Sequence, residues 1–239
     1  MDFKKISIIV PCYNESRTIA KILDKVSKAD TLGLKKEIIV VDDGSKDGTR
    51  KILEKYRKRK GFIIIFHENN TGKGGALKTG FLESTGDLVI VQDADLEYNP
   101  DEYKLLMNPI IDKNYDVVYG SRYRGMSHKA LYSWHSLVNK SLTAFSNLLT
   151  GLKLTDMETC YKMFKGEIIR ELATNLESKR FGFEPEITAK LAHRKNIKFF
   201  EVGISYNGRD YREGKHIDWR DGVKAVLEII KYNVFIKHE

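Results

Sequence analysis

The stretch Val89-Ile90-Val91-Gln92-Asp93-Ala94-Asp95-Leu96-Glu97 places an apolar run directly before acids at alternate positions. The run from Leu88 to Val91 has the length and β-branching of a buried strand, so the acids follow that strand's C-terminal end. In open α/β sheets ligands bind at this edge, because loops and helix N-termini converge there. In extended chain Asp93, Asp95 and Glu97 would point one way and repel one another unless a cation joined them. The pattern fits a hard divalent ion that also binds phosphate oxygens, although a solvated acidic turn would carry the same string.

Short apolar strands alternate with amphipathic helices over the first half of the chain. We expect strands over residues 6–10, 38–41, 62–66, 88–91 and 116–119. Helices are expected between them, the first opening at residues 14–16 and burying Ile19, Ile22, Leu23 and Val26. The alternation predicts an α/β fold with a mostly parallel sheet and right-handed crossovers. Pro11 is expected to end the first strand, because proline donates no hydrogen bond to a sheet ladder.

The alternation of short strands and helices ends after Arg122. One long helix is indicated around residues 134–148, and only residues 199–204 form a convincing later strand. Residues 121–220 are therefore expected to build onto the sheet rather than to fold as an independent domain. The tail has Val223, Val226, Leu227 and further apolar residues at helical spacing with lysines between them. Such a helix could lie in a membrane interface or dock on the protein core.

The composition is that of an ordinary globular protein, with 31% charged and 41% hydrophobic residues. A net charge of +8 over 239 residues indicates an anionic partner: nucleic acid, an acidic membrane surface or a phosphorylated substrate. Cys12 and Cys160 show neither metal-ligand spacing nor a disulfide framework, which fits a reducing compartment. There is no N-terminal leader pattern and no apolar run near the ~20 residues that span a bilayer. We expect a cytoplasmic protein, or one bound peripherally to the cytoplasmic face of a membrane.

A glycine-rich loop, Thr71-Gly72-Lys73-Gly74-Gly75, precedes a predicted helix. Glycines let backbone N–H groups approach a phosphate, and Lys73 is a candidate to contact the phosphates of a nucleotide. The loop is not a Walker loop, because His67 stands where the first glycine belongs and Gly74 where Ser or Thr should hold magnesium. A plain flexible turn is the alternative.

Several motifs together resemble glycosyltransferase family 2 with the GT-A fold. They are Val10-Pro11-Cys12-Tyr13-Asn14-Glu15, then Val41-Asp42-Asp43-Gly44-Ser45, then Gln92-Asp93-Ala94-Asp95-Leu96-Glu97. Gly120-Ser121-Arg122 and residues 156–164 and 208–215 look like the polyprenyl-phosphate branch, the dolichyl-phosphate mannose or glucose synthases. The resemblance implies a Rossmann-like GT-A sheet with helices on both faces. It also implies one catalytic domain over 1–220, with a nucleotide-sugar half (1–120) and an acceptor half (121–220), followed by a C-terminal amphipathic helix over 221–239.

The resemblance assigns a nucleotide-sugar donor to the first half of the chain. It implies that Pro11, Tyr13 and Glu15 line the base pocket. Asp42 or Asp43 would hold the nucleoside, although an Asp-Gly-Ser string is also a common helix cap.

The same resemblance implies that Asp93, Asp95 and Glu97 hold Mg²⁺ or Mn²⁺ against the donor diphosphate. Transfer from a nucleotide sugar collects negative charge on the leaving diphosphate, so a metal ion and nearby cations are needed there. Asp95 is accordingly expected to be essential for turnover. A single displacement predicts inversion, which gives a β-linked product from an α-linked donor.

The acceptor is expected to be a polyprenyl or dolichyl phosphate. Arg122, Arg209 and Lys215 match positions that hold acceptor or donor phosphates, and guanidinium groups bind phosphate bidentately. A phosphate acceptor needs no base to remove a proton, whereas a hydroxyl acceptor would need one, with Asp156 or Glu184 as the candidates.

Two other functions share some of these features. A soluble family 2 enzyme with a saccharide or small hydroxyl acceptor would carry the same donor motifs. A nucleic-acid-binding protein would use the positive charge. We expect no nucleic acid, because the aromatic residues do not interleave with the basic ones and the acids at the sheet edge would repel phosphate without a metal.

Overall fold

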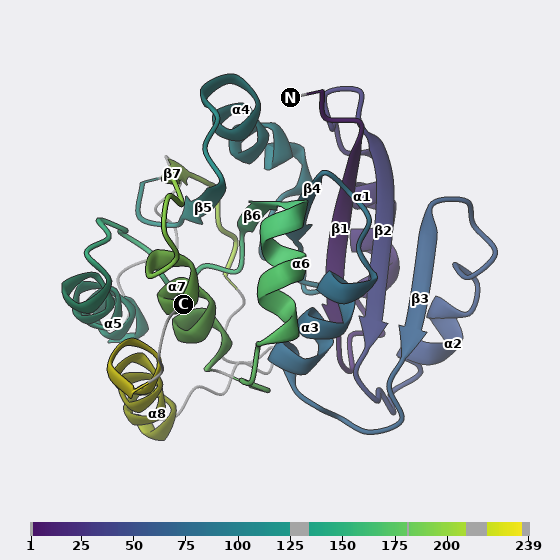
Figure 1. Ribbon diagram of the computed structural model, residues 1–239. Helices are drawn as coiled ribbons and strands as arrows, with labels where there is room; N and C mark the ends of the chain where they lie inside the picture. The colour runs from purple at the N-terminus through teal and green to yellow at the C-terminus, as the bar shows by residue number, and fades with distance from the viewer. Residues whose placement is uncertain (1, 125–133, 181, 209–218, 236–239) are drawn as a thin grey trace.

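The computed structural model describes residues 2–124, 134–180, 182–208 and 219–235. Its centre is a seven-stranded sheet with the strand order β3-β2-β1-β4-β6-β5-β7 (Figure 1). The strands are β1 (Lys5–Cys12), β2 (Lys35–Asp42), β3 (Phe62–Phe66), β4 (Leu88–Val91), β5 (Val117–Ser121), β6 (Lys162–Lys165) and β7 (Phe199–Gly203). All neighbours are parallel except β6, which runs antiparallel to both β4 and β5.

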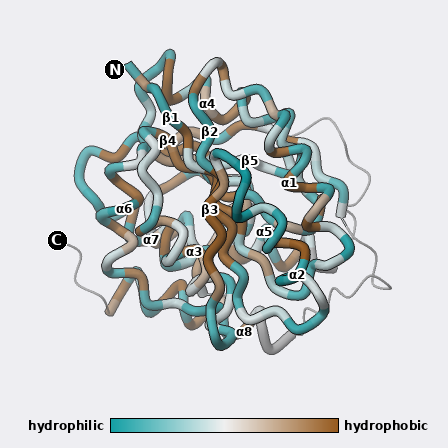
Figure 2. The backbone as a smooth tube through the Cα atoms, turned by 90° about the vertical axis from the view of Figure 1, so that its right-hand side faces the viewer, coloured by the Kyte–Doolittle hydropathy of each residue, from teal (hydrophilic) through white to brown (hydrophobic). Residues whose placement is uncertain are grey.

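Helices cover both faces of the sheet, as the resemblance implies (Figure 1). The helices are α1 (Ile19–Lys28), α2 (Thr49–Leu53), α3 (Lys73–Glu83), the 3₁₀ turn η1 (Pro100–Glu102), α4 (Tyr103–Lys113), α5 (Trp134–Thr150), α6 (Gly166–Thr174), α7 (Phe183–Ala192), α8 (Trp219–Ile230) and the π-helical turn η3 (Lys231–Phe235). One core packs the sheet against α1 and α4, and a second packs it against α3, α6 and α7. Figure 2 shows the apolar residues gathered along the strands and the hydrophilic ones mostly on the outer turns.

The main difference from the expected fold is β6, which the sequence pattern did not predict. Its four residues, Lys-Met-Phe-Lys, are too short and too charged at the ends to stand out as a strand. In the sheet β6 lies between β4 and β5 and is buried throughout. Because β6 is antiparallel, its N-terminal end lies at the same edge as the C-terminal ends of β4 and β5. Residues 156–161, which precede β6, therefore reach the candidate site.

Pro11 does not end β1, which continues to Cys12. The ladder between β1 and β4 ends at the pair Ile9 and Val91, so beyond it β1 has a neighbour only in β2. Proline is tolerated there because a strand with one neighbour needs fewer ladder donors. Helix α1 likewise begins later than expected, at Ile19. Asn14 has a positive φ of 54°, and its side chain accepts a hydrogen bond from Lys46 N at 2.9 Å, so this segment bridges to the loop after β2 instead.

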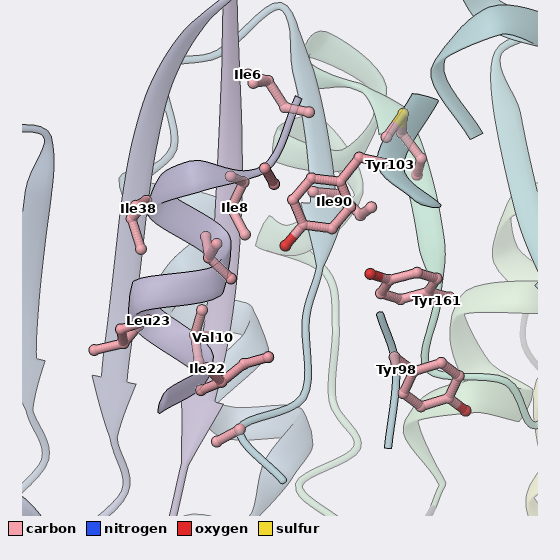
Figure 3. Close-up of a cluster of buried hydrophobic side chains, with 14 of the residues drawn as sticks. Ile6, Ile8, Val10, Ile22, Leu23, Ile38, Ile90, Tyr98, Tyr103 and Tyr161 are labelled. Atoms are coloured by element: carbon pink, nitrogen blue, oxygen red, sulfur yellow. The ribbon is translucent and has the colours of Figure 1, made fainter. Parts of the chain in front are cut away.

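A cluster of tyrosines supports the end of β4. The hydroxyls of Tyr103 and Tyr161 both donate to Gln92 Oε1, each at 2.9 Å. Tyr98 stacks on Tyr161 with ring centroids 4.9 Å apart, and Figure 3 shows the three rings in a row beside Ile90. Gln92 is fully buried and immediately precedes the acids, so this cluster fixes where the acidic turn begins.

The C-terminal segment is helical from Trp219 to Ile230 and continues as a π-helical turn to Phe235, while residues 236–239 lie outside the described chain. Ala225 and Ile229 on α8 pack against Leu142 of α5 and against Met157. The helix therefore docks on the core. Other apolar residues of α8 stay exposed to solvent, and Leu227 is 61% exposed.

Candidate active site

Asp42 and Asp43, at the end of β2, have different surroundings. Asp43 accepts hydrogen bonds from the backbone N–H groups of Thr71 and Gly72, at 2.9 and 2.7 Å, and contacts His67 Nδ1 at 2.8 Å. Burial opposes ionisation of Asp43, but hydrogen bonds from Thr71, His67 and Gly72 hold its pKa below the usual value. Asp43 thus organises the glycine-rich loop.

Asp42 is fully buried and has one oxygen without a hydrogen-bond partner. Its Oδ2 accepts from Arg50 Nε at 2.7 Å and from Ser45 N at 3.3 Å. Its Oδ1 is buried and receives no hydrogen bond. A buried acceptor without a donor is costly, so Asp42 is the member of the pair that retains capacity for a ligand.

The glycine-rich loop uses its backbone to join two parts of the chain. Gly72 N donates to Asp43, and Gly74 N donates to Lys179 O at 3.0 Å. A Cβ on Gly72 or on Gly74 would meet the backbone oxygens of Lys179 or Ser178 at 2.1 Å in each case. Glycine is needed here for the close approach of residues 178–179, and the amides of Gly72 and Gly74 do not form a free phosphate cradle. The loop's contribution to the site is Lys73, the first residue of α3.

Lys73 lies among acidic and sulfur groups at the sheet edge. Its Nζ is 2.9 Å from Asp93 Oδ1, 3.7 Å from Glu184 Oε1 and 2.7 Å from Cys160 Sγ. Burial would lower the pKa of Lys73, but Asp93 and its other neighbours hold it well above the usual value. Burial would likewise raise the pKa of Asp93, yet Lys73 keeps it lowered. The pair is ionised, and the ammonium of Lys73 supplies positive charge beside Asp93.

The three acids after β4 do not line one side of an extended segment. Leu96 has a positive φ of 68°, which turns the chain between Asp95 and Glu97. Glu97 is buried and accepts a hydrogen bond from Tyr206 Oη at 2.8 Å, whereas Asp93 faces Lys73. Among the described residues, no group of three or more His, Cys, Asp or Glu side chains is arranged to hold a metal ion.

Asp93 and Asp95 nevertheless fit a divalent ion. Carboxylate oxygens are the ligands that Mg²⁺ prefers, and Mg²⁺ is usually held by one or two carboxylates completed by substrate phosphates. Both aspartates are partly accessible, whereas Glu97 is buried. The two aspartates therefore offer the ligand type of a metal ion that phosphate oxygens complete, whereas the buried Glu97 is engaged by Tyr206.

Arg122, just beyond β5, is already paired. Its Nε and Nη2 donate to the two carboxylate oxygens of Asp156, both at 2.7 Å, and its backbone N also donates to Oδ2. Burial disfavours the charged guanidinium, but Asp156 holds the pKa of Arg122 well above its usual value. The bidentate face expected to clamp a phosphate is thus occupied by Asp156. The same pairing explains why Asp156, fully buried, is a poor candidate for a base.

Other predicted residues at this edge fall into two groups. Pro11 is buried in β1, while Tyr13 is 47% exposed and Glu15 partly exposed just beyond it. Arg209 and Lys215 lie outside the described residues, and so does Arg212.

Sequence reasoning missed Glu158, which lies in the segment leading into β6. Its Oε1 is buried and has no hydrogen-bond partner. The only available signal was the charge pattern Asp156, Glu158 and Lys162 before an apolar pair, which is uninformative until β6 is known to enter the sheet.

The sequence and the fold are similar to those of known proteins. The family described as glycosyl transferase family 2 matches residues 7–173. A dolichyl-phosphate beta-glucosyltransferase of Trichomonas vaginalis is 27% identical, covering 97% of this chain and 74% of its own length. An undecaprenyl-phosphate 4-deoxy-4-formamido-L-arabinose transferase of Edwardsiella ictaluri is 28% identical, covering 90% and 65%.

Among solved structures, glucosyl-3-phosphoglycerate synthase of Mycobacterium tuberculosis, crystallised with Mn²⁺ and uridine diphosphate, superposes with a TM-score of 0.68. It is 20% identical, and the match covers 96% of this chain and 80% of that one. The likeness confirms the mixed α/β fold with its mostly parallel sheet. The family match over most of the chain confirms the resemblance that the motifs suggested: this protein is a glycosyltransferase and belongs to glycosyl transferase family 2.

Proposed function

We propose that this enzyme transfers a hexose from a nucleotide diphosphate sugar, GDP-mannose or UDP-glucose, to a polyprenyl phosphate with inversion at the anomeric carbon. One observation carries the proposal. The relatives named for dolichyl and undecaprenyl phosphate match 97% and 90% of this chain, so the likeness extends through the acceptor half.

On the donor side, Pro11, Tyr13 and Glu15 form the surface for the base. Asp42 holds the nucleoside, because its unpartnered Oδ1 can accept a hydrogen bond from a hydroxyl or an N–H group. Asp93 and Asp95 would hold Mg²⁺ or Mn²⁺. A bound ion supplies positive charge to the departing diphosphate.

Lys73 neutralises Asp93 when the donor is absent and can contact the donor phosphates when they arrive, since its ammonium lies 2.9 Å from Asp93. On the acceptor side, a phosphate oxygen is ionised near neutral pH and attacks without losing a proton. This agrees with the pairing of Arg122 with Asp156, because no base is needed there. Arg209 and Lys215 are proposed to contact phosphate.

Peripheral contact with a membrane is part of the proposal, because the acceptor is a lipid. Across the described residues, no helix combines the length and the apolar character needed to cross a bilayer. Helices α5 and α8 pack together, and with the turn η3 they leave apolar side chains outside, among them Leu137, Leu148, Val223, Leu227 and, on η3, Phe235. Exposed apolar residues on adjoining elements, with Lys224 and Lys231 between them, suit the headgroup region of an anionic membrane.

Two measurements test the donor and the acceptor separately. Thermal shifts with UDP and GDP, each with and without Mn²⁺, should show metal-dependent stabilisation by one nucleotide. Transfer from UDP-glucose or GDP-mannose is then assayed with farnesyl phosphate, free glucose and 3-phosphoglycerate as acceptors. We expect a β-linked product on farnesyl phosphate. Transfer only to a soluble acceptor would replace the lipid proposal, and an α-linked product would overturn inversion.

Membrane contact is tested by sedimentation with lipid vesicles in which about one lipid in five is the anionic phosphatidylglycerol. Leu227→Ser combined with Val226→Ser should lower the bound fraction several-fold, because both side chains are exposed on α8. Leu82→Ser, which removes a comparably exposed apolar side chain from α3, is the matched control. Equal binding by all three proteins would reject α8 as the contact.

A further inference from the structure

The segment that leads into β6 is held rigidly by the groups around it. The ammonium of Lys162 donates to Met157 O at 3.0 Å and also to Thr159 O, and so bridges the residues on either side of Glu158. Cys160 N donates to the hydroxyl of Tyr98 at 3.2 Å. Lys162 is almost fully buried, and burial lowers its pKa. The backbone around Glu158 is therefore preorganised.

Glu158 is the exception in this satisfied segment, because its buried Oε1 has no hydrogen-bond partner. Leaving a buried polar atom without a partner costs roughly 1–3 kcal/mol in proteins, so such an atom in a rigid segment calls for a ligand. The charged groups near Glu158 come from its own segment, from β6, from the residue after β5 and from α7. They are Asp156, Lys162, Arg122 and Glu184.

The charges at this part of the edge balance without Glu158. The cations are Lys73, Lys162 and Arg122, and the acids that face them, apart from Glu158 itself, are Asp93, Asp156 and Glu184. An ionised Glu158 would add a negative charge in a partly buried place where its Oε1 is shielded from water. Burial, together with the charge of Glu184, raises the pKa of Glu158 to about 8. At pH 7 the side chain is mostly a neutral carboxylic acid, which can donate a hydrogen bond.

We propose that Glu158 binds the acceptor phosphate as a neutral carboxylic acid, whose O–H donates a hydrogen bond to a phosphate oxygen. This inference rests on the proposed function, since it requires a phosphate acceptor. With Arg122 occupied by Asp156, a neutral donor adds to the binding of an anion without leaving an unpaired charge when the site is empty. Glu158 is a binding residue in this role and removes no proton.

The test compares steady-state transfer to farnesyl phosphate in the wild type, Glu158→Ala and Glu158→Gln between pH 7.5 and 9.5. The acceptor phosphate remains doubly ionised over this range. For a group with a pKa of about 8, the protonated fraction falls about 25-fold between these limits. The wild-type KM for farnesyl phosphate should rise by a similar factor while kcat changes little.

Glu158→Ala should raise KM about tenfold at pH 7.5. Glu158→Gln, whose amide also donates, should recover most of that loss and show no rise of KM with pH. Glu83→Gln, the same change at an exposed position on α3, should follow the wild type throughout. Thermal unfolding of each variant establishes that the compared proteins are folded.

The outcomes separate this inference from the proposed function. If the wild type transfers to farnesyl phosphate but Glu158→Gln keeps the wild-type pH dependence of KM, the role of Glu158 is wrong and the function stands. If Glu158→Gln loses kcat while KM is unchanged, Glu158 is a base rather than a hydrogen-bond donor. If the wild type uses only 3-phosphoglycerate or free glucose, the polyprenyl-phosphate function fails, and this inference fails with it.

Discussion

The two halves of the sheet edge treat their acids differently. After β4, Asp93 and Asp95 remain partly accessible, and the positive charge beside Asp93 comes from the ammonium of Lys73. Beyond β5, Asp156 is fully buried and held by both arms of Arg122. Lysine offers a point charge that can be shared with a ligand, whereas a bidentate arginine pair excludes one. Acids at one edge of a sheet can therefore remain open to a ligand in one half and stabilise the fold in the other.

Breaking the Arg122–Asp156 pair should have the largest effect, and the effect should be on stability. Arg122→Met leaves a buried carboxylate unpaired and should cost about 3–5 kcal/mol in the free energy of unfolding. Urea denaturation measures it. The double variant Arg122→Met with Asp156→Leu should be less destabilised than either single one. A double variant as unstable as the sum of the two would show that the pair is not coupled.

Removing Asp95 should instead affect turnover. Asp95→Ala is expected to lower kcat on the order of 10²–10³-fold, because stabilisation of the departing diphosphate is lost. The melting temperature should stay within a few degrees. Asp101→Ala, which removes an exposed carboxylate a short distance further on, serves as the control. Equal activity of the two variants would place the chemistry elsewhere.

Gly72→Ala tests the contact that joins the two halves. Gly72 has a φ of 85°, and a Cβ would meet Lys179 O at 2.1 Å, so the backbone of one loop must move. We expect a loss of about 2–3 kcal/mol in unfolding free energy. Gly33→Ala has a similar φ of 80° and open space around the new Cβ, so it measures the backbone strain alone. If Gly72→Ala lost no more unfolding free energy than Gly33→Ala, the close packing of Gly72 against Lys179 would be contradicted.

Asp43→Asn should have the smallest effect, and the effect should depend on pH. The pKa of Asp43 is lowered in the folded protein, so its ionised form stabilises the fold above its unfolded pKa. This stabilisation is lost as pH falls through the lower folded pKa. Near pH 7 the variant should be less stable by about 1–2 kcal/mol, and the difference should shrink below pH 4. The midpoints of urea unfolding at several pH values measure this difference in stability. Asp112→Asn, at an exposed position, is the control.

The first half of the chain, residues 1–120, was predictable because its signals are local. Each parallel strand is an apolar run followed by polar residues, and the edge rule for α/β sheets then gathers Tyr13, Asp42 and Asp93 at one side. The part of the chain after residue 120 was harder to predict. Its antiparallel strand β6 is four residues long, and helices α6 and α7 follow without the alternation of strand and helix that guided the first half.

Sequence by itself determined the family, the mostly parallel sheet and the edge at which the acids lie, since apolar periodicity and motif spacing are properties of neighbouring residues. Only the tertiary structure decided how the charges are shared. It assigned Asp43 to the glycine-rich loop, Asp156 to Arg122 and Lys73 to Asp93. It also left Glu158 with an oxygen that has no hydrogen-bond partner. The reason is physical: a carboxylate's partner and its pKa depend on burial and on groups brought from distant parts of the chain, and these contacts exist only after folding.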